Sequence, residues 1–168
     1  MSQVRGLVLA AGRGERMRPL TDHTPKPLLQ VQGKPLLQAW VEALERVGVG
    51  EIVLNTAWLG EQVEAFARAW SQGPGRARLQ ISSEGRDFGH ALETAGGIAR
   101  ALPLLAPKAD DVFWVVAGDV HAPDFVPEAA AVQRFASLRD SRLTRQRVRD
   151  QGLLLRWVGW TCVPTTLQ

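Results

Sequence analysis

Short apolar runs alternate with amphipathic stretches along residues 4–120 of the chain. A buried parallel strand reads as a continuous run rich in β-branched residues. Such runs predict strands at 4–10, 51–57, 77–82 and 111–120. Apolar side chains that recur every three or four residues predict helices at 34–47, 60–70 and 92–105. We expect the segment 83–91 to be irregular. This alternation predicts a three-layer α/β/α domain with a Rossmann-like, mostly parallel sheet.

Residues 137–168 break this pattern. They are dense in arginine, show neither the helical nor the strand period, and end in turn-forming residues. A segment that buries little apolar surface does not offset the entropy of ordering it, so we expect much of this tail to be poorly ordered. We therefore divide the chain into a domain at 1–136 and an atypical basic tail at 137–168, a truncated or aberrant C-terminal part.

The net charge of +3 and the isoelectric point near 9.7 suggest a nucleic-acid partner at first sight. However, six of the 20 basic and two of the 17 acidic residues lie beyond residue 136. Residues 1–136 therefore contain 14 basic and 15 acidic residues. The body of the protein is therefore close to neutral. Because the basic tail also lacks interleaved aromatic residues before Trp157, we expect no nucleic-acid partner.

Cysteine content and hydropathy restrict the cellular setting. Cys162 is the single cysteine, which excludes an internal disulfide and a cysteine metal cluster. No apolar run approaches the length that crosses a bilayer, and the N-terminus lacks the apolar core of a signal peptide. We expect a cytoplasmic protein without a membrane partner.

The segment at 9–29, "LAAGRGERMRPLTDHTPKPLL", follows the first predicted strand and concentrates the candidate chemistry. Small residues allow backbone N–H groups to turn inward and form an anion-binding nest. Those residues are Ala10, Ala11, Gly12 and Gly14. Arg16 and Lys26 could neutralise phosphate oxygens, with Pro25 and Pro27 holding Lys26 in extended backbone. The alternative is an ordinary glycine turn with solvated arginines. The motif is neither a Walker A loop nor the Rossmann G-x-G-x-x-G.

Asp119 stands at the carboxyl end of the most hydrophobic predicted strand. Ligands of parallel sheets bind beyond the carboxyl ends of strands, so Asp119 fits a metal ligand as well as a strand-end cap. Gly96 and Gly97 fit either helix packing or close approach to a ligand. We expect His90 and His121 to be incidental polar residues. Core and helix-face packing is expected for the tryptophans Trp40, Trp58, Trp70 and Trp114.

The segment at 9–29 resembles the signature of the sugar-1-phosphate nucleotidyltransferases, L-A-A-G-x-G-x-R-x-x-P-L-T-x-x-x-P-K-P-L, and meets each of its fixed positions. Residues 15–28, 55–64 and 92–105 look most like the bacterial N-acetylmuramate-1-phosphate uridylyltransferases of peptidoglycan recycling. The resemblance covers residues 1–135. It implies transfer of UMP from UTP to a sugar 1-phosphate such as N-acetylmuramate 1-phosphate, with release of pyrophosphate. Guanylyl transfer to mannose 1-phosphate and thymidylyl transfer to glucose 1-phosphate are the alternatives.

The same resemblance implies roles for individual residues. Gly14, Glu15 and Arg16 would hold the triphosphate, and Lys26 would contact the phosphate under attack. Ala117 would touch the nucleotide, and Asp119 would bind Mg²⁺. The two glycines in 92–105, Gly96 and Gly97, would approach the base or the sugar.

The resemblance ends near residue 135. Relatives of this kind continue with several strands that supply the sugar pocket and a second metal-binding aspartate. The carboxylates after Asp119, which are Asp124, Glu128, Asp140 and Asp150, have no family-like context. We therefore expect nucleotide binding with little turnover, and an inactive nucleotide-binding fragment stays open as an alternative.

Overall fold

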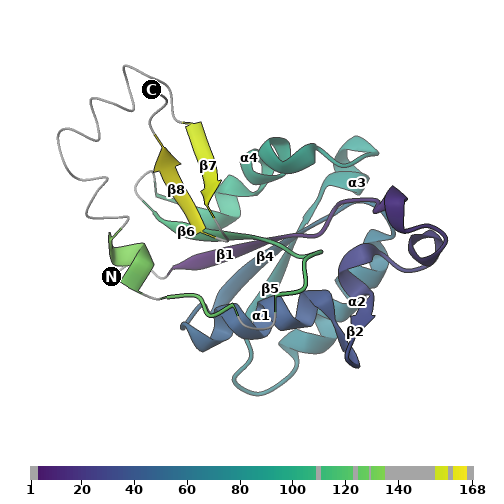
Figure 1. The fold of residues 1–168 in the computed structure, drawn as a ribbon, viewed down its shortest axis with the longest axis horizontal. Coiled ribbons are helices and arrows are strands. Elements are labelled where there is room, and N and C mark those ends of the chain that lie inside the picture. Colours follow the sequence, from purple (N-terminus) through teal and green to yellow (C-terminus); the bar gives the residue numbers. More distant parts are fainter. Residues whose placement is uncertain are drawn as a thin grey trace. The chain divides into compact units, whose positions relative to one another are not determined.

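A computed structural model describes residues 4–108, 111–122, 125–128 and 130–134, and the backbone of 154–158 and 161–165. By its internal contacts the chain divides into two units, Met1–Val126 and Pro127–Gln168. The first unit contains a four-stranded sheet, which is drawn in Figure 1. Among the described residues, no helix combines the length and the apolar character that a membrane span requires.

The sheet of the first unit has four strands in the order β5-β4-β1-β6. Its members are β1 (Arg5–Leu9), β4 (Glu51–Thr56), β5 (Arg78–Ser83) and β6 (Phe113–Ala117). All three pairings are parallel, and Leu7 at the centre of β1 lies level with Val53 on one side and Val115 on the other. The carboxyl ends of all four strands therefore meet at one edge of the sheet.

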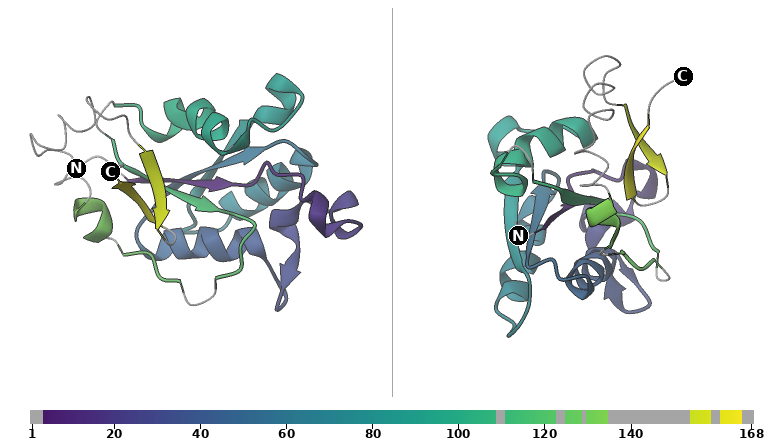
Figure 2. Two further views of the ribbon diagram at one scale, coloured as in Figure 1. Left: turned by 45° about the horizontal axis from the view of Figure 1, so that its top comes forward. Right: turned by 90° about the vertical axis from the view of Figure 1, so that its left-hand side faces the viewer.

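Helices cover both faces of this sheet. Figures 1 and 2 show α1 (Leu36–Arg46) and α2 (Gly60–Ser71) on one face and α4 (Glu93–Leu105) on the other. This arrangement confirms the predicted three-layer α/β/α fold, and each predicted strand and long helix is present within a few residues of its expected bounds.

The core beneath α4 fixes this helix over the centre of the sheet. Leu7, Val53 and Val115 from three neighbouring strands pack with Ala101 and Leu105 of α4, and all are buried. Burying a large aliphatic side chain contributes about 1.5–3 kcal/mol. Because α4 is held in this way, its N-terminus lies at the carboxyl edge of the sheet, where β1 leads into the glycine-rich segment.

Several short elements differ from the sequence-based expectation. The segment expected to be irregular contains a short helix, α3 (Glu84–Phe88), which ends at Gly89 with φ of 79°. The connection from β1 to α1 contains three 3₁₀ helices and a small antiparallel hairpin. These are η1 (Glu15–Met17), η2 (Leu20–Asp22), η3 (Lys26–Leu28), β2 (Gln30–Val31) and β3 (Lys34–Pro35). Helices of three to five residues and strands of two residues are too short to show a period, so tertiary contacts decide them.

An ion pair ties the small hairpin to α1. Lys34 Nζ lies 3.3 Å from Glu42 Oε2, and Gln38 Nε2 donates to the other carboxylate oxygen at 2.9 Å. Partial burial raises the pKa of Glu42, but the hydrogen bonds from Gln38 and Lys34 outweigh it and hold the pKa below its usual value. The hairpin is thereby held against the helix that follows it.

The second unit contains a pair of antiparallel strands, β7 (Leu154–Val158) and β8 (Thr161–Thr165). The sequence pattern did not predict this hairpin. The rest of the tail, including Asp140 and Asp150, lies outside the described residues, as does Asp124 in the first unit. The expectation that much of 137–168 is poorly ordered, and the boundary expected after residue 136, therefore stay predictions.

Candidate functional site

The segment after β1 winds around the carboxyl edge of the sheet and is held there by its own hydrogen bonds. We call residues 10–16 the phosphate loop, after its expected role. Gly14 has φ of 67°, a left-handed conformation that favours glycine. Its carbonyl oxygen accepts from Thr21 Oγ1 at 2.9 Å and from the Met17 amide at 2.9 Å. A Cβ at Gly14 would lie 3.0 Å from Thr21 Cγ2 and 3.1 Å from Lys26 Cβ, so space also requires glycine here.

Lys26 and Asp119 form an ion pair across the mouth of the site, with Nζ and Oδ2 2.6 Å apart. The prediction that Lys26 lies in extended backbone is wrong. Pro25 is extended, but Lys26 is the first residue of η3, because the chain turns back toward α1 at this point. Asp119 is placed by Gly118, whose Cβ would lie 2.9 Å from the carbonyl oxygen of Leu9. The end of β6 therefore passes close to β1.

Arg13 is directed away from the Lys26–Asp119 pair. Its guanidinium carbon lies 3.9 Å from the centre of the Trp58 ring, and its Nε lies 3.6 Å from Glu15 Oε1. Trp58 in turn donates its indole N–H to the carbonyl oxygen of Thr21 at 2.9 Å. A cation over an indole ring is worth about 0.5–1 kcal/mol where exposed. Trp58 thus fastens the phosphate loop from outside.

The opposite wall of the site is formed by buried polar groups. Asn55 at the end of β4 and Glu84 at the start of α3 are 3% and 0% exposed. Asn55 Oδ1 accepts from the Ala10 amide at 2.6 Å, and Asn55 Nδ2 donates to Glu84 Oε1 at 2.7 Å. The amide of Ala10, a residue predicted to belong to the anion nest, therefore donates to Asn55.

Of the two glycines of α4, Gly97 lies behind this wall. Gly97 is buried, and a Cβ there would lie 2.7 Å from both Asn55 Nδ2 and Glu84 Oε1. A Cβ at Gly96 would meet Leu92 Cβ at 2.7 Å. Neither glycine is among the residues that line the cavity. These contacts therefore fit the prediction of helix packing better than the prediction of close approach to a ligand. Their expected approach to the base or sugar stays a prediction.

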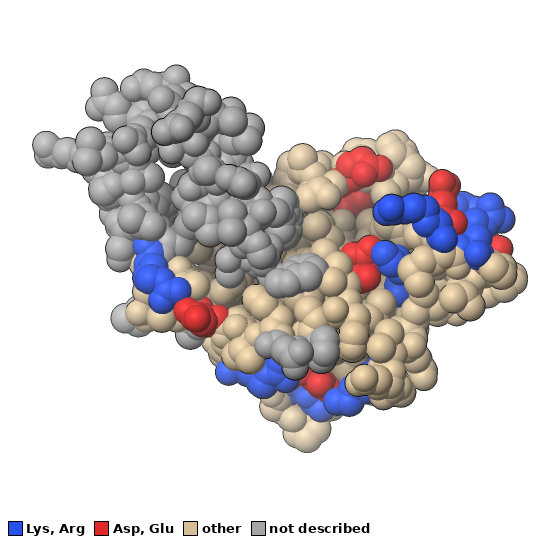
Figure 3. Space-filling view, in the orientation of Figure 1, with Lys and Arg blue, Asp and Glu red and all other residues tan. Residues whose placement is uncertain are grey.

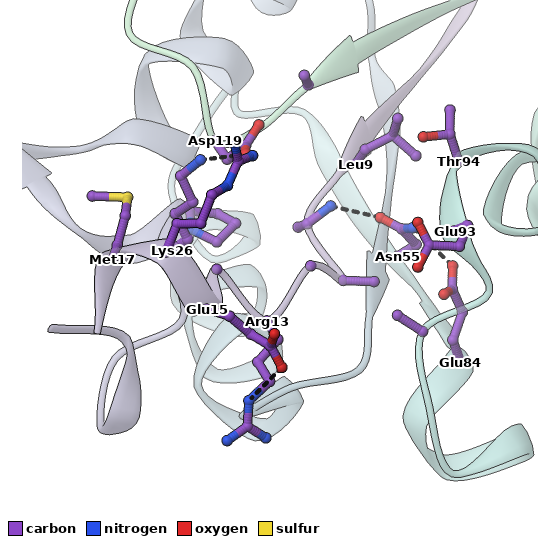
Figure 4. A pocket seen from close by; sticks show the side chains of 18 residues that line it. Leu9, Arg13, Glu15, Met17, Lys26, Asn55, Glu84, Glu93, Thr94 and Asp119 are labelled. Carbon is purple, nitrogen blue, oxygen red and sulfur yellow. Dashed lines mark hydrogen bonds and ion pairs between the residues drawn. The ribbon is translucent and has the colours of Figure 1, made fainter. Parts of the chain in front are cut away.

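These elements enclose a cavity of about 750 Å³, into which Lys26 and Asp119 project from one side and Glu93 and Thr94 from the other (Figure 4). Nine of the predicted site residues line this cavity: Ala10, Ala11, Gly12, Gly14, Glu15, Arg16, Lys26, Ala117 and Asp119. Basic and acidic side chains gather at the right-hand end of the molecule in Figure 3, where the loop lies in Figure 1. Within the described residues, no group of three or more histidine, cysteine or acidic side chains is close enough to hold a metal ion.

Asn55, Glu84 and Thr94 were not among the predicted site residues, and Trp58 was predicted to serve packing. Asn55 is the last residue but one of β4, and Glu84 directly follows β5. A polar residue near the end of a strand is the same signal that identified Asp119. Trp40 and Trp114 are buried, as expected, at 3% and 6% exposure.

The fold and this site define a nucleotidyltransferase domain. Residues 6–142 match the model of the MobA-like NTP transferase domain, and the chain belongs to that family. It is 50% identical over 136 residues to N-acetylmuramate alpha-1-phosphate uridylyltransferase of Neisseria meningitidis, a match that covers 80% of this chain and 54% of the relative. The resemblance to sugar-1-phosphate nucleotidyltransferases is thereby confirmed.

Two further relatives extend the comparison. The catalytic subunit beta of mannose-1-phosphate guanylyltransferase of Danio rerio is 37% identical over 117 residues, which cover 70% of this chain and 31% of the relative. The crystal structure of a putative glucose-1-phosphate thymidylyltransferase from Bacillus anthracis is similar, with a TM-score of 0.59 and 25% identity. That match covers 81% of this chain and 51% of the other. The chain thus spans about half the length of the Neisseria relative.

Proposed function

We propose that this chain binds UTP in the cavity at the carboxyl edge of its sheet and transfers UMP to a sugar 1-phosphate, releasing pyrophosphate. N-acetylmuramate 1-phosphate is the proposed acceptor, and recycling of peptidoglycan in the cytoplasm is the proposed setting. The single observation that carries this is the convergence of the phosphate loop, Lys26 and Asp119 on one cavity of about 750 Å³.

The loop supplies the groups that a triphosphate requires. The exposed guanidinium of Arg16 borders the cavity beside the left-handed turn at Gly14, and Lys26 borders it from η3. A guanidinium can bind two phosphate oxygens at once, whereas a lysine acts as a point charge. We assign Gly14, Glu15 and Arg16 to the triphosphate and Lys26 to the phosphate under attack.

In the proposed reaction, an oxygen of the sugar 1-phosphate attacks the α-phosphorus of UTP. The new P–O bond forms as the bond to the β-phosphate oxygen breaks, and pyrophosphate leaves. Such a transfer depends on alignment and charge neutralisation more than on a proton-transferring side chain. Arg16 and Lys26 both line the cavity, and their cations would offset the negative charge that collects around the reacting phosphate.

Asp119 is the residue that we propose to hold Mg²⁺. Mg²⁺ is commonly bound through one or two carboxylates together with substrate phosphate oxygens, so the carboxylate of Asp119 beside Lys26 fits this ion. The Asp119 side chain is 41% exposed and is therefore accessible from the cavity. Bound there, Mg²⁺ would neutralise phosphate charge and orient the leaving group. Its positive charge would also replace that of Lys26 as the partner of the Asp119 carboxylate.

The identity of the nucleotide is proposed from the Neisseria relative, whose name specifies uridylyl transfer. Guanylyl transfer to mannose 1-phosphate is the second candidate, because the Danio relative carries that name at lower identity. Thymidylyl transfer to glucose 1-phosphate is the third candidate, for the same reason.

Calorimetric titration of UTP, GTP and dTTP in Mg²⁺ tests the proposal. We expect UTP to bind most tightly, and Arg16→Ala and Lys26→Ala to weaken it by roughly tenfold or more, since a charged hydrogen bond contributes about 1.5–3 kcal/mol. Arg100→Ala is the matched control, because Arg100 pairs with Asp87 away from the cavity. Equal affinity in all of these proteins would exclude the loop as the binding site.

Pyrophosphate release tests the transfer step separately. Release that requires both UTP and N-acetylmuramate 1-phosphate would support the transferase. Tight UTP binding without release would favour the alternative that this chain only binds the nucleotide.

A further inference from the structure

A chain of hydrogen bonds joins the phosphate loop to the beginning of α4. The Ala10 amide donates to Asn55, Asn55 donates to Glu84, and Glu84 Oε2 accepts from the Leu92 amide at 2.7 Å. Figure 4 shows Asn55 and Glu84 side by side at the wall of the cavity. We call these three hydrogen bonds the Asn55–Glu84 relay.

The relay works only with one amide and one carboxylate. Both of its ends are backbone N–H donors, those of Ala10 and Leu92. A carboxylate offers two acceptors, and a side-chain amide offers one acceptor and one donor. Asn55 and Glu84 therefore satisfy all three hydrogen bonds, whereas two amides or two carboxylates would leave one contact repulsive.

At both of its ends the relay binds backbone amides next to the cavity. Ala10 begins the phosphate loop, and Leu92 immediately precedes Glu93, which lines the cavity with φ of 58°. A non-glycine residue keeps such a conformation only where its surroundings enforce it. The hydrogen bond from the Leu92 amide to Glu84 holds the residue directly before this conformation. Gly97 leaves the space that the relay occupies, since a Cβ there would lie 2.7 Å from both side chains.

We propose that Asn55 and Glu84 are positioning residues, which hold the phosphate loop and the first turn of α4 at a fixed separation and thereby set nucleotide affinity. This inference rests on the proposed function of the cavity. Both side chains are almost completely buried, so they act through the backbone groups that they bind. A loop that is already ordered loses less entropy when the triphosphate binds, which strengthens binding.

Reversal of the relay provides the test. Glu84→Gln leaves two donors facing each other at one of the three contacts, and Asn55→Asp places two carboxylates together. The double variant Asn55→Asp/Glu84→Gln restores all three hydrogen bonds with the middle one reversed. We expect each single variant to weaken UTP binding by roughly tenfold or more, because a buried donor or acceptor is left unpaired. The double variant should recover to within about threefold of the wild type.

Amide hydrogen exchange at Ala10 and Leu92, together with thermal melting, separates positioning from general stability. Both single variants should exchange faster at these amides than the double variant and the wild type. Asp87→Asn, a carboxylate-to-amide change outside the cavity, is the matched control. Single variants that stay folded and bind UTP like the wild type would overturn the proposal. So would a double variant that binds no better than the single ones.

The test also separates this inference from the proposed function. If the wild type binds no nucleoside triphosphate, the proposed function fails. The amide exchange rates at Ala10 and Leu92 then still test whether the relay holds the loop. Loss of protection in the single variants with recovery in the double variant would then support the relay as the holder of the loop. Unchanged protection in all variants would overturn it.

Discussion

At the level of single residues, the ion pair between Lys26 and Asp119 couples the proposed phosphate-binding cation to the proposed metal-binding carboxylate. Asp119→Asn keeps the shape and removes the charge. Without metal, the variant should bind UTP at least as tightly as the wild type, because a negative charge beside the phosphates is gone and Lys26 is released. Mg²⁺ should raise the affinity of the wild type for UTP. The same increase should be smaller in Asp119→Asn, by a factor of roughly ten or more.

Titrations of UTP in Mg²⁺ and in EDTA measure this difference. Asp87→Asn, at an exposed pair with Arg100, is again the matched control and should show the same Mg²⁺ effect as the wild type. If Asp119→Asn retains the whole Mg²⁺ effect, the metal assignment is wrong.

Sequence position explains which of the site residues could be predicted. Lys26 and Asp119 are 93 positions apart, yet both belong to segments that follow buried strands, and parallel strands bring such segments to one edge. Asn55, near the end of β4, and Glu84, directly after β5, lie at the same edge. They were missed, since nothing in the sequence pairs an asparagine with a glutamate 29 positions later. Trp58 was misread because a tryptophan contributes both to packing and to loop anchoring.

At the level of elements, the phosphate loop contains two glycines with different roles. Gly14→Ala should destabilise the protein and weaken UTP binding, because φ of 67° costs a non-glycine residue roughly 1–2 kcal/mol and the new Cβ crowds Lys26. A Cβ at Gly12 would meet nothing within 4 Å, so Gly12→Ala should leave the melting temperature unchanged. Since Gly12 borders the cavity, the same substitution should still weaken UTP binding.

Gly33→Ala separates backbone strain from the site. Gly33 lies between β2 and β3 with φ of 79° and open space around it, so the variant should be destabilised but bind UTP normally. Thermal melting and UTP titration of the three variants check these expectations. A Gly14→Ala protein that is as stable as the wild type would contradict the loop geometry described above.

Glu45 at the end of α1 joins three elements through its carboxylate. It accepts from Trp70 Nε1 of α2 at 2.9 Å, from Arg76 Nη1 at 3.1 Å and from the Ala77 amide at 2.7 Å. Glu45→Ala removes all three acceptors, so we expect a loss of about 2–3 kcal/mol in the free energy of unfolding, measured in urea. Nucleotide affinity should be unchanged, because Glu45 does not border the cavity.

Arg68→Ala serves as the control for this surface. Arg68 is largely exposed and lies 3.9 Å from Glu64, so its removal should cost well under about 1 kcal/mol. Equal effects of the two substitutions would mean that the Glu45 contacts add no net stability.

The long elements could be predicted because each repeats its pattern over several turns or residues. Leu37, Val41 and Leu44 form the buried stripe of α1 that the helical period predicts. The segment between β1 and α1 offered no such repeat. Its 3₁₀ helices depend on contacts such as Thr21 with Gly14, which join residues through the fold rather than through a period.

For the whole molecule, the distribution of the core indicates which part carries the site. The buried hydrophobic side chains among the described residues run from Leu7 to Val116, and the residues that line the cavity run from Leu9 to Asp119. Both sets belong to the unit Met1–Val126. A chain that ends at Val126 should therefore retain its fold and its nucleotide site.

We expect this shortened chain to bind UTP within about threefold of the full-length affinity, because a threefold change is only about 0.7 kcal/mol and no cavity-lining residue is removed. Circular dichroism would establish that it is folded, and UTP titration would measure the affinity. Lys26→Ala in the shortened chain is the matched control, and it should weaken binding by the same factor as in the full chain. A shortened chain that is folded but no longer binds UTP would assign part of the site to residues 127–168. Retained binding with an undiminished Lys26 effect would place the whole nucleotide site within residues 1–126.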